Sequence, residues 1–243
     1  TKKTKAIMPV SLYGQPADMD AIQVIANKYN LKIIIDGAQS FGSTYNNKFD
    51  SSLGDISITS FFPSKPLGCY GDGGAIFTNN DEYAQKIKML RVHGQNKRFK
   101  HKYIGIGGRL DTIQAGILLA KIPNFTKELN DRQKVADYYT DNLSKILQTP
   151  IIRSNRSSSW AQYTLRVNDR DNLQQKLKDK GIPTSFFYPM PLHLQECFKY
   201  LNYKENDFSV SEKASKEVIS IPMNAFLVDQ ELDYIIRNII ICN

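Results

Sequence analysis

The chain has 243 residues, of which 41% are hydrophobic and 23% are charged, and its formal net charge is +8. This length allows one large domain or two smaller ones, and the composition excludes a disordered chain. No apolar stretch is long enough to cross a bilayer and residues 1–5 do not lead into a signal-peptide pattern, so we expect no membrane insertion.

The first half of the chain alternates between strand and helix patterns. Strands are predicted at residues 5–10, 31–35, 55–61 and 75–78, and helices at residues 18–29 and about 81–90. Asp18 is the predicted N-cap of the first helix. The apolar run Leu31–Ile35 is typical of a strand that is buried on both faces of a parallel sheet. The alternation therefore predicts an α/β layer with crossover helices.

The second half has a different pattern. A helix is predicted to begin near Asp111 and to be interrupted at Pro123, and a second helix then runs to about Leu143. The serine-rich residues 154–159 are interpreted as a linker tip. Beyond them, strands are predicted at 160–167 and 184–187 and helices at 173–180, 211–220 and 229–240. These elements indicate a small α+β domain, and we divide the chain into residues 1–125 and 126–243.

An acid, a hydroxyl and a lysine follow two successive strands. Asp36 ends the first apolar run, Ser60 ends the next, and Lys65 comes five residues later beside a glycine-rich segment. Ligands of open α/β sheets bind at the carboxyl ends of the strands. Pyridoxal phosphate needs a lysine for a Schiff base and an acid for its pyridine nitrogen, and a hydroxyl suits its phosphate. Gln39 is placed to donate to its phenolic oxygen.

Each of these residues also has a structural interpretation. Asp36 can simply cap the turn that follows it, Ser60 can be an ordinary strand-end serine, and most lysines lie in solvent. Lys65 departs from that pattern because it lies between Pro63 and Pro66 and among apolar residues, where a charged amine is disfavoured.

Four further residues are candidates for substrate binding. His93 follows a predicted helix, and Arg109 can pair with Asp111 or with a phosphate. Tyr188 and His193 flank a proline-stiffened loop that is either structural or able to reach a cleft. The three histidines and the widely spaced cysteines Cys69, Cys197 and Cys242 favour neither a metal site nor disulfides, and they suggest a reducing cytoplasm.

The densest charge cluster is residues 97–102, Lys-Arg-Phe-Lys-His-Lys. It is either a solvated loop or a binding site for phosphates of a cofactor, of a nucleotide-linked substrate or of nucleic acid. We expect no nucleic-acid partner, because no helix-turn-helix or aromatic-interleaved basic motif accompanies the charge.

Several segments together resemble the DegT/DnrJ/EryC1/StrS family of sugar aminotransferases. They are residues 35–42, 59–68, 73–75, 91–94, 109–115 and 191–195. The segment around Lys65 is the most specific, and the resemblance extends along the whole chain. Within the family, the chain is similar to enzymes that aminate a 3-oxo sugar acid on UDP in bacterial O-antigen biosynthesis.

The resemblance implies a type I aminotransferase fold, with residues 1–125 as part of the large domain that binds pyridoxal phosphate. It implies a homodimer with active sites at the subunit interface and glutamate as amino donor. It assigns the Schiff base to Lys65, the pyridine nitrogen to Asp36, the phenolic oxygen to Gln39 and the phosphate to Ser60. The substrate is then a keto-hexose linked to UDP or dTDP.

Two departures from the family pattern stand out. The family's chain normally begins well before Thr1, so we expect an N-terminally truncated sequence that binds the cofactor weakly or not at all. Many members have an asparagine where this chain has Gly107. A non-catalytic fragment that dimerises without turnover is therefore the alternative function.

Overall fold

The computed structural model describes residues 1–243, which divide into two units. Unit 1 comprises residues 1–129 and 152–161, and unit 2 comprises residues 130–151 and 162–243. The α-helices are α1 (Met19–Tyr29), α2 (Asp81–Leu90), α3 (Thr112–Leu143), α4 (Arg170–Asp179), α5 (Ser209–Glu217) and α6 (Asp229–Cys242). The strands are β1 (Ala6–Ile7), β2 (Lys32–Asp36), β3 (Thr44–Tyr45), β4 (Lys48–Phe49), β5 (Ile56–Ser60), β6 (Gly74–Phe77), β7 (Gln95–Lys97), β8 (Lys100–His101), β9 (Tyr163–Arg166) and β10 (Val218–Ile221). No helix is long and apolar enough to cross a membrane.

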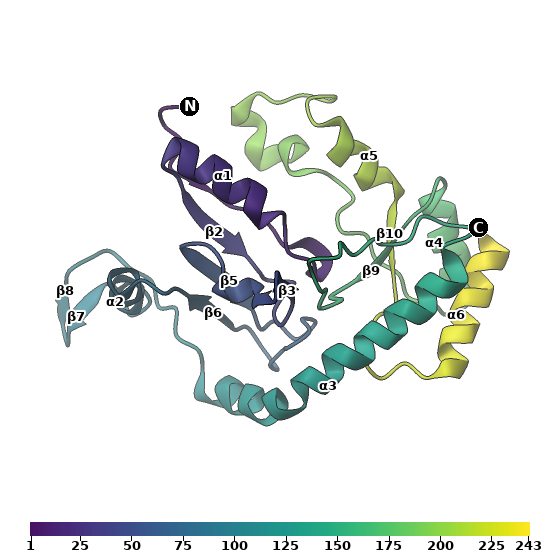
Figure 1. Ribbon diagram of the computed structural model, residues 1–243, viewed down its shortest axis with the longest axis horizontal. Helices are drawn as coiled ribbons and strands as arrows, with labels where there is room; N and C mark the ends of the chain where they lie inside the picture. Colours follow the sequence, from purple (N-terminus) through teal and green to yellow (C-terminus); the bar gives the residue numbers. More distant parts are fainter. The chain divides into compact units, whose positions relative to one another are not determined.

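Unit 1 is built on a four-stranded sheet of order β1-β2-β5-β6 (Figure 1). β1, β2 and β5 are parallel, and β6 is antiparallel to β5. Helix α1 connects β1 to β2, and the Asp18 side chain accepts a hydrogen bond from the Ala21 N–H at 3.2 Å, as predicted for its N-cap. The predicted α/β layer with a mostly parallel sheet is confirmed.

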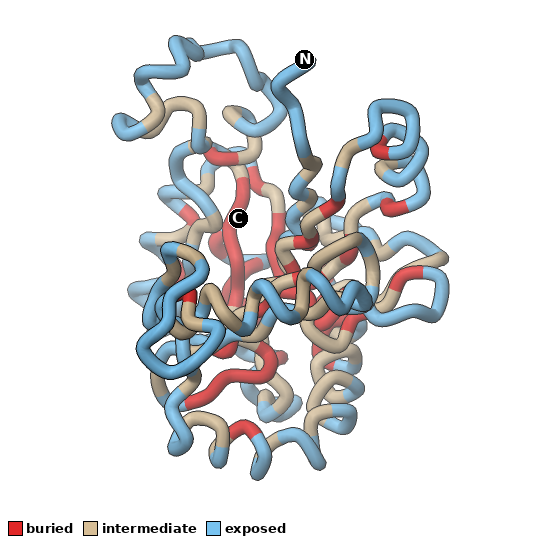
Figure 2. Tube along the Cα trace, turned by 90° about the vertical axis from the view of Figure 1, so that its left-hand side faces the viewer, coloured by how far each residue is buried: buried red, intermediate tan, exposed pale blue.

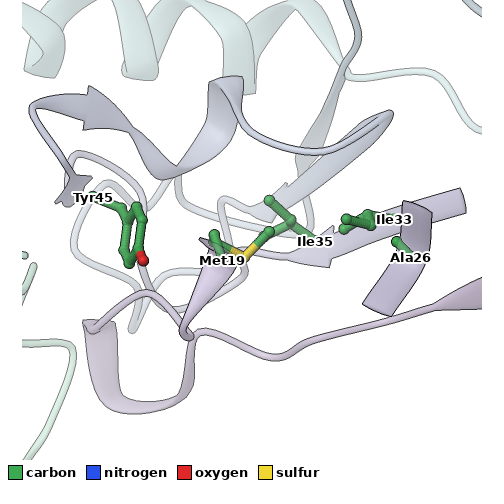
Figure 3. Close-up of a cluster of buried hydrophobic side chains, with 5 residues drawn as sticks. All are labelled: Met19, Ala26, Ile33, Ile35 and Tyr45. Atoms are coloured by element: carbon green, nitrogen blue, oxygen red, sulfur yellow. The ribbon is translucent and has the colours of Figure 1, made fainter. Parts of the chain in front are cut away.

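One face of this sheet carries a core of unit 1. Ile33 and Ile35 of β2 pack with Met19 and Ala26 of α1 and with Tyr45 (Figure 3). Figure 2 shows the buried stretches of the chain in red, between exposed stretches in pale blue. The prediction that residues 31–35 are buried on both faces was wrong, because successive side chains alternate and Ile34, on the other face, is only partly buried.

Unit 2 holds a two-stranded antiparallel sheet of β9 and β10, with α4 packed against β10 and α6. Its fully buried side chains include Tyr139, Tyr163, Leu165 and Ile219. This is the small α+β arrangement that the sequence predicts. The assignment of residues 1–125 and 126–243 to the two family domains stays a prediction.

Three local predictions were wrong. Helix α3 continues through Pro123, because a proline removes only one hydrogen bond and a long helix tolerates that loss. Residues 154–159 are no linker tip, since Ser158 and Ser159 are buried in unit 1. The predicted helix 211–220 ends at Glu217, where the apolar β-branched residues of β10 begin.

The predicted strand at 184–187 is reduced to one bridge, between Ser185 and Ser220.

Candidate active site

Asp36 is the last residue of β2, at the carboxyl edge of the parallel strands. Its backbone N–H donates to the Pro9 carbonyl at 2.9 Å and its carbonyl accepts from the Ser11 N–H at 3.0 Å, so the backbone is held on one side by the segment after β1. The half-buried carboxylate accepts a hydrogen bond from the Ala38 N–H at Oδ1, 3.1 Å away. Its second oxygen, Oδ2, makes no hydrogen bond or ion pair. One oxygen is therefore left to bind a cationic group.

Ser60 lies on the same face of the sheet as Asp36. Asp36 pairs in parallel register with Ile58, and Ser60 follows two residues later, so all three side chains point to the same face. The Ser60 Oγ accepts a hydrogen bond from the Phe62 N–H at 3.2 Å. Its own hydrogen is therefore available to an anion beyond the end of β5.

Lys65 lies in the loop that leaves β5 at this edge. The loop is closed by backbone hydrogen bonds from Phe61 to Gly73 and from Cys69 to Phe61, each 2.8 Å, and Lys65 N–H donates to the Phe62 carbonyl at 2.9 Å. The residues that follow it, Pro66 and Leu67, are buried, while Lys65 itself is half-buried. Its side-chain amine makes no hydrogen bond or ion pair. Backbone hydrogen bonds thus hold the loop in place, and the amine of Lys65 is left without a partner in the chain.

Gln39 is buried in the turn that follows Asp36. Its Oε1 accepts the Tyr13 N–H at 2.6 Å, which fixes the orientation of the amide, because only the oxygen can accept. The Nε2 group makes no hydrogen bond and is left as a donor. This is the polarity that the sequence analysis expected of Gln39.

Two groups that support this turn were not found from the sequence. Ser159 donates from Oγ to the Gln39 carbonyl at 2.6 Å, although 120 residues separate them. Asp50, only 1% exposed, accepts a hydrogen bond from the Ser40 Oγ. Burial raises the pKa of Asp50, and the Ser40 hydrogen bond opposes that rise. Neither residue follows a strand in a motif, so no signal in the local sequence marks them.

His93 and Arg109 lie elsewhere in unit 1, on either side of the β7–β8 hairpin. Both are exposed, and Arg109 makes no ion pair with Asp111 or any other acid. Gly107 bridges to Val92, and a Cβ on Gly107 would lie 3.0 Å from Cε1 of His93. The His93 ring therefore crowds the place where an asparagine side chain would start.

Tyr188 and His193 belong to unit 2. Tyr188 is 57% exposed. The His193 ring is nearly buried, with Nε2 2.9 Å from Oε1 of Glu212 and its centre 4.8 Å from that of Phe208. Glu212 also accepts backbone hydrogen bonds from Asn206 and Phe208, and the Asn206 bond is the main reason that the pKa of Glu212 is lowered. The contacts of His193 with Glu212 and Phe208 therefore stabilise a loop. Substrate binding by Tyr188 or His193 stays a prediction.

The model of the DegT/DnrJ/EryC1/StrS aminotransferase family matches residues 1–240. The chain belongs to this family. Membership confirms the resemblance and the fold class that were inferred from the motifs around Asp36 and Lys65.

Two relatives and one solved structure illustrate the similarity. A UDP-2-acetamido-2-deoxy-3-oxo-D-glucuronate aminotransferase of Pseudomonas aeruginosa is 49% identical over 228 residues, which cover 93% of this chain and 63% of the relative. A pleiotropic regulatory protein of Geobacillus stearothermophilus is 45% identical over 243 residues, which cover 98% of this chain and 65% of the relative. The chain thus spans less than two thirds of the length of these relatives.

The solved structure is the Bacillus subtilis protein ntda with bound cofactor PMP. It superposes with a TM-score of 0.90 at 29% identity, over 100% of this chain and 57% of that protein. PMP is the aminated form of pyridoxal phosphate, so this neighbour binds the cofactor that an aminotransferase uses.

Proposed function

We propose that this chain belongs to a pyridoxal phosphate-dependent enzyme that transfers an amino group to a keto group of a hexose linked to a nucleoside diphosphate. The observation that carries the proposal is the set of free groups at one edge of one sheet. Asp36, Ser60 and the Lys65 loop leave neighbouring strands at that edge, as the motif predicts. The name of the Pseudomonas aeruginosa relative supports UDP and a 3-oxo sugar as the substrate class.

The donor set fits pyridoxal phosphate. The cofactor offers an aldehyde, a basic ring nitrogen, a phenolic oxygen and a phosphate. The chain offers an unpaired amine on Lys65, an unpaired carboxylate oxygen on Asp36, an unpaired amide N–H on Gln39 and a hydroxyl hydrogen on Ser60. Each group of the cofactor thus has one complementary partner.

Asp36 would keep the ring nitrogen protonated, because its free Oδ2 is an acceptor with no competing cation. Pyridoxal phosphate, when bound, withdraws electrons from the carbon that gains or loses the amino group. The Ala38 N–H holds the other carboxylate oxygen, so the acid stays oriented. Gln39 would donate from Nε2 to the phenolic oxygen, and Ser60 would donate from Oγ to the phosphate.

Nζ of Lys65 would hold the cofactor, and the same atom would carry a proton during the reaction. No carboxylate of the chain competes for this amine, since Lys65 makes no ion pair. When it does not hold the cofactor, the Lys65 amine would be the base that accepts a proton at Nζ and the acid that then donates it. The same atom therefore serves both half-reactions.

The remaining parts of the proposal concern partners and setting. We infer that glutamate is the amino donor, that the enzyme is a homodimer, and that residues 1–125 are part of its large domain. We also propose that the enzyme acts in the cytoplasm, in bacterial surface-polysaccharide biosynthesis.

Replacement of Lys65 tests the proposal. In the full-length enzyme, Lys65→Ala is expected to lower amino transfer from glutamate to a UDP-linked 3-keto sugar by about 1,000-fold or more, because both covalent attachment and proton transfer are lost. Lys48→Ala, at an exposed lysine without an ion pair, is the matched control and should keep its rate. Equal rates for Lys65→Ala and the control would contradict the proposal.

A second candidate function is a regulatory role without turnover, which the name of the Geobacillus stearothermophilus relative favours. The two functions differ in one measurement. A regulatory protein would show no amino transfer from glutamate to any keto sugar while still folding and dimerising. Turnover by the full-length protein rules this candidate out as the sole function.

A further inference from the structure

One face of helix α3 lies against the Lys65 loop, which comprises residues 61–73 between β5 and β6. Gln114, Leu118, Lys121 and Phe125 follow one another at intervals of three or four residues, so they share one side of α3. On that side Leu118 is buried with three residues of the loop, namely Phe61, Leu67 and Cys69. The first half of α3 is therefore packed on the loop.

Two polar side chains of this face bind the backbone of the Lys65 loop. The Lys121 ammonium donates to the Gly68 carbonyl at 2.6 Å, and the Gln114 Oε1 accepts the Tyr70 N–H at 2.8 Å. No other group of the chain pairs with that carbonyl or with that N–H. Lys121 forms no ion pair, so the Gly68 carbonyl is the only hydrogen-bond partner of its ammonium group.

The bond from Lys121 satisfies a buried group. Gly68 is buried, so its carbonyl would be an unsatisfied acceptor if the donor were lost. A half-buried lysine loses side-chain freedom and some hydration of its charge, and both losses cost free energy. A hydrogen bond from a charged donor is stronger than one between neutral groups, and it offsets these costs. One point of the loop is thereby fixed to α3.

A fixed Gly68 also fixes the residues just before Lys65. A Cβ on Gly68 would lie 2.6 Å from the Pro63 carbonyl oxygen and 2.7 Å from that of Phe62, so only glycine lets the two limbs of the loop approach so closely. The Lys65 N–H donates to the same Phe62 carbonyl at 2.9 Å. A shift of Gly68 away from Lys121 therefore moves the backbone that sets the position of the Lys65 amine.

The stretch between the two bonds to α3, residues 68–71, has further close contacts. The Cys69 N–H donates to the Phe61 carbonyl at 2.8 Å, and the Cys69 Sγ lies 3.0 Å from the same oxygen. A Cβ on Gly71 would lie 2.9 Å from Nε2 of Gln114, so the backbone passes directly beside that amide. The bonds from α3 therefore hold the whole stretch against the start of the loop.

We propose that Lys121 and Gln114 are positioning residues for the Lys65 amine. They act through the loop, because neither of them binds the Lys65 side chain. Covalent attachment and proton transfer depend steeply on position, and a displacement of about 1 Å costs about 100-fold in rate. The inference rests on the proposed function for the identity of the group that Lys65 binds.

Hydrogen exchange of the full-length protein without cofactor tests whether α3 fixes the loop. In Lys121→Met and in Gln114→Leu, the backbone amides of residues 67–74 should exchange about tenfold faster or more, because the bonds to α3 are lost while the side-chain volume is kept. Lys134→Met is the matched control, since Lys134 is an exposed lysine of the same helix that pairs only with Asp131, at 2.7 Å. Its loop should exchange at the parental rate.

The rate at which Lys65 takes up pyridoxal phosphate, trapped with borohydride, tests the position of the amine and needs no turnover. Lys121→Met and Gln114→Leu should slow this attachment by about tenfold or more. Lys121→Arg keeps a charged donor and Gln114→Glu keeps an acceptor for the Tyr70 N–H, so both should attach the cofactor within about threefold of the parental rate.

Steady-state kinetics separate positioning from substrate binding. Lys121→Met should lower kcat by about 10- to 100-fold and leave KM for the UDP-linked keto sugar within about twofold, because Lys121 acts through the loop. A purely structural role would lower the melting temperature without this split, and Lys121→Arg would then give no rescue of kcat.

Two results overturn the proposal. One is parental exchange of residues 67–74 in both Lys121→Met and Gln114→Leu, since α3 then does not fix the loop. The other is parental attachment of pyridoxal phosphate to Lys65 in variants whose loop exchanges faster, since the loop then does not position the amine. Failure of the proposed function is a separate result, because a parent protein that attaches the cofactor at Lys65 but transfers no amino group still gives both measurements.

Discussion

Asp36 and Asp50 both accept hydrogen bonds from the turn that follows β2, but their surroundings differ. Asp36 is half-buried, and its free oxygen is at the sheet edge. Asp50 is 1% exposed, its Oδ2 accepts from Ser40, and its Oδ1 has no partner in hydrogen-bond geometry, although the Ser11 hydroxyl is near enough to lower the pKa of Asp50. Burying a carboxylate oxygen that has no hydrogen-bond donor costs free energy. The ionised form of Asp50 therefore lowers the stability of the turn, although its hydrogen bond with Ser40 supports that turn.

Asp50→Asn is therefore expected to stabilise the protein at neutral pH by about 1 kcal/mol. Because burial raises the pKa of Asp50 in the folded state, the folded protein binds its proton more tightly than the unfolded chain. The free energy of unfolding then falls as the pH rises from the unfolded pKa, near 3.8, through the folded pKa. Urea unfolding of both proteins at pH 7 and at about pH 3.5 measures this.

The difference between Asp50→Asn and the parent protein should shrink at the acid end, where Asp50 is neutral in both states. A variant that is less stable than the parent at pH 7, or a difference that does not change with pH, would show that Asp50 is well satisfied as an anion.

At the scale of single residues, the sequence pointed to candidate residues that are marked by nearby positions in the chain. Asp36 and Lys65 stand out because an acid and a lysine follow strand patterns next to glycines. Asp50 and Ser159 do not stand out, because their burial depends on partners that the fold brings together from distant positions. For His193 the loop pattern left a structural role and substrate binding open, and its ring contacts Glu212 and Phe208, while substrate binding stays a prediction.

At the scale of elements, segment 152–161 contributes contacts to the candidate site that the sequence did not predict. Its serines resemble a linker by composition, yet Ser157 accepts the Thr44 N–H at 2.8 Å and Ser159 donates to the Gln39 carbonyl. A hydroxyl can be buried at low cost when it meets a backbone group of another segment, and one sequence alone does not reveal such a meeting. Helix α3 is a second element that local sequence does not explain, because tertiary packing outweighs the helix-breaking effect of Pro123.

Ser159→Ala is expected to lower the free energy of unfolding by about 1–2 kcal/mol, because the Gln39 carbonyl loses its buried donor. The turn that presents Gln39 then loosens, so the affinity for pyridoxal phosphate should fall as well. Chemical denaturation and a cofactor titration measure the two effects.

Ser154→Ala is the matched control, since Ser154 is exposed and makes no hydrogen bond. It should change the stability by less than about 0.5 kcal/mol. A Ser159→Ala protein that matches this control in both measurements would mean that segment 152–161 does not support the turn.

At the scale of the whole molecule, the alternation of strands and helices was sufficient to predict an α/β protein with a mostly parallel sheet. The positions of β2 and β5 followed from apolar runs, and their shared edge followed from the rule for open sheets. The return of residues 152–161 to unit 1 was not predictable, because it depends on long-range hydrogen bonds rather than on pattern.

The central claim is that the amine of Lys65 and the carboxylate of Asp36 belong to one cofactor site. The most direct measurement is to load the full-length protein with pyridoxal phosphate, reduce it with borohydride and locate the adduct by peptide mass. We predict a single pyridoxyl group on the peptide that contains Lys65, in reduced yield when Asp36 is replaced by Asn. An adduct on a different lysine, or none on the peptide of Lys65, would contradict the account.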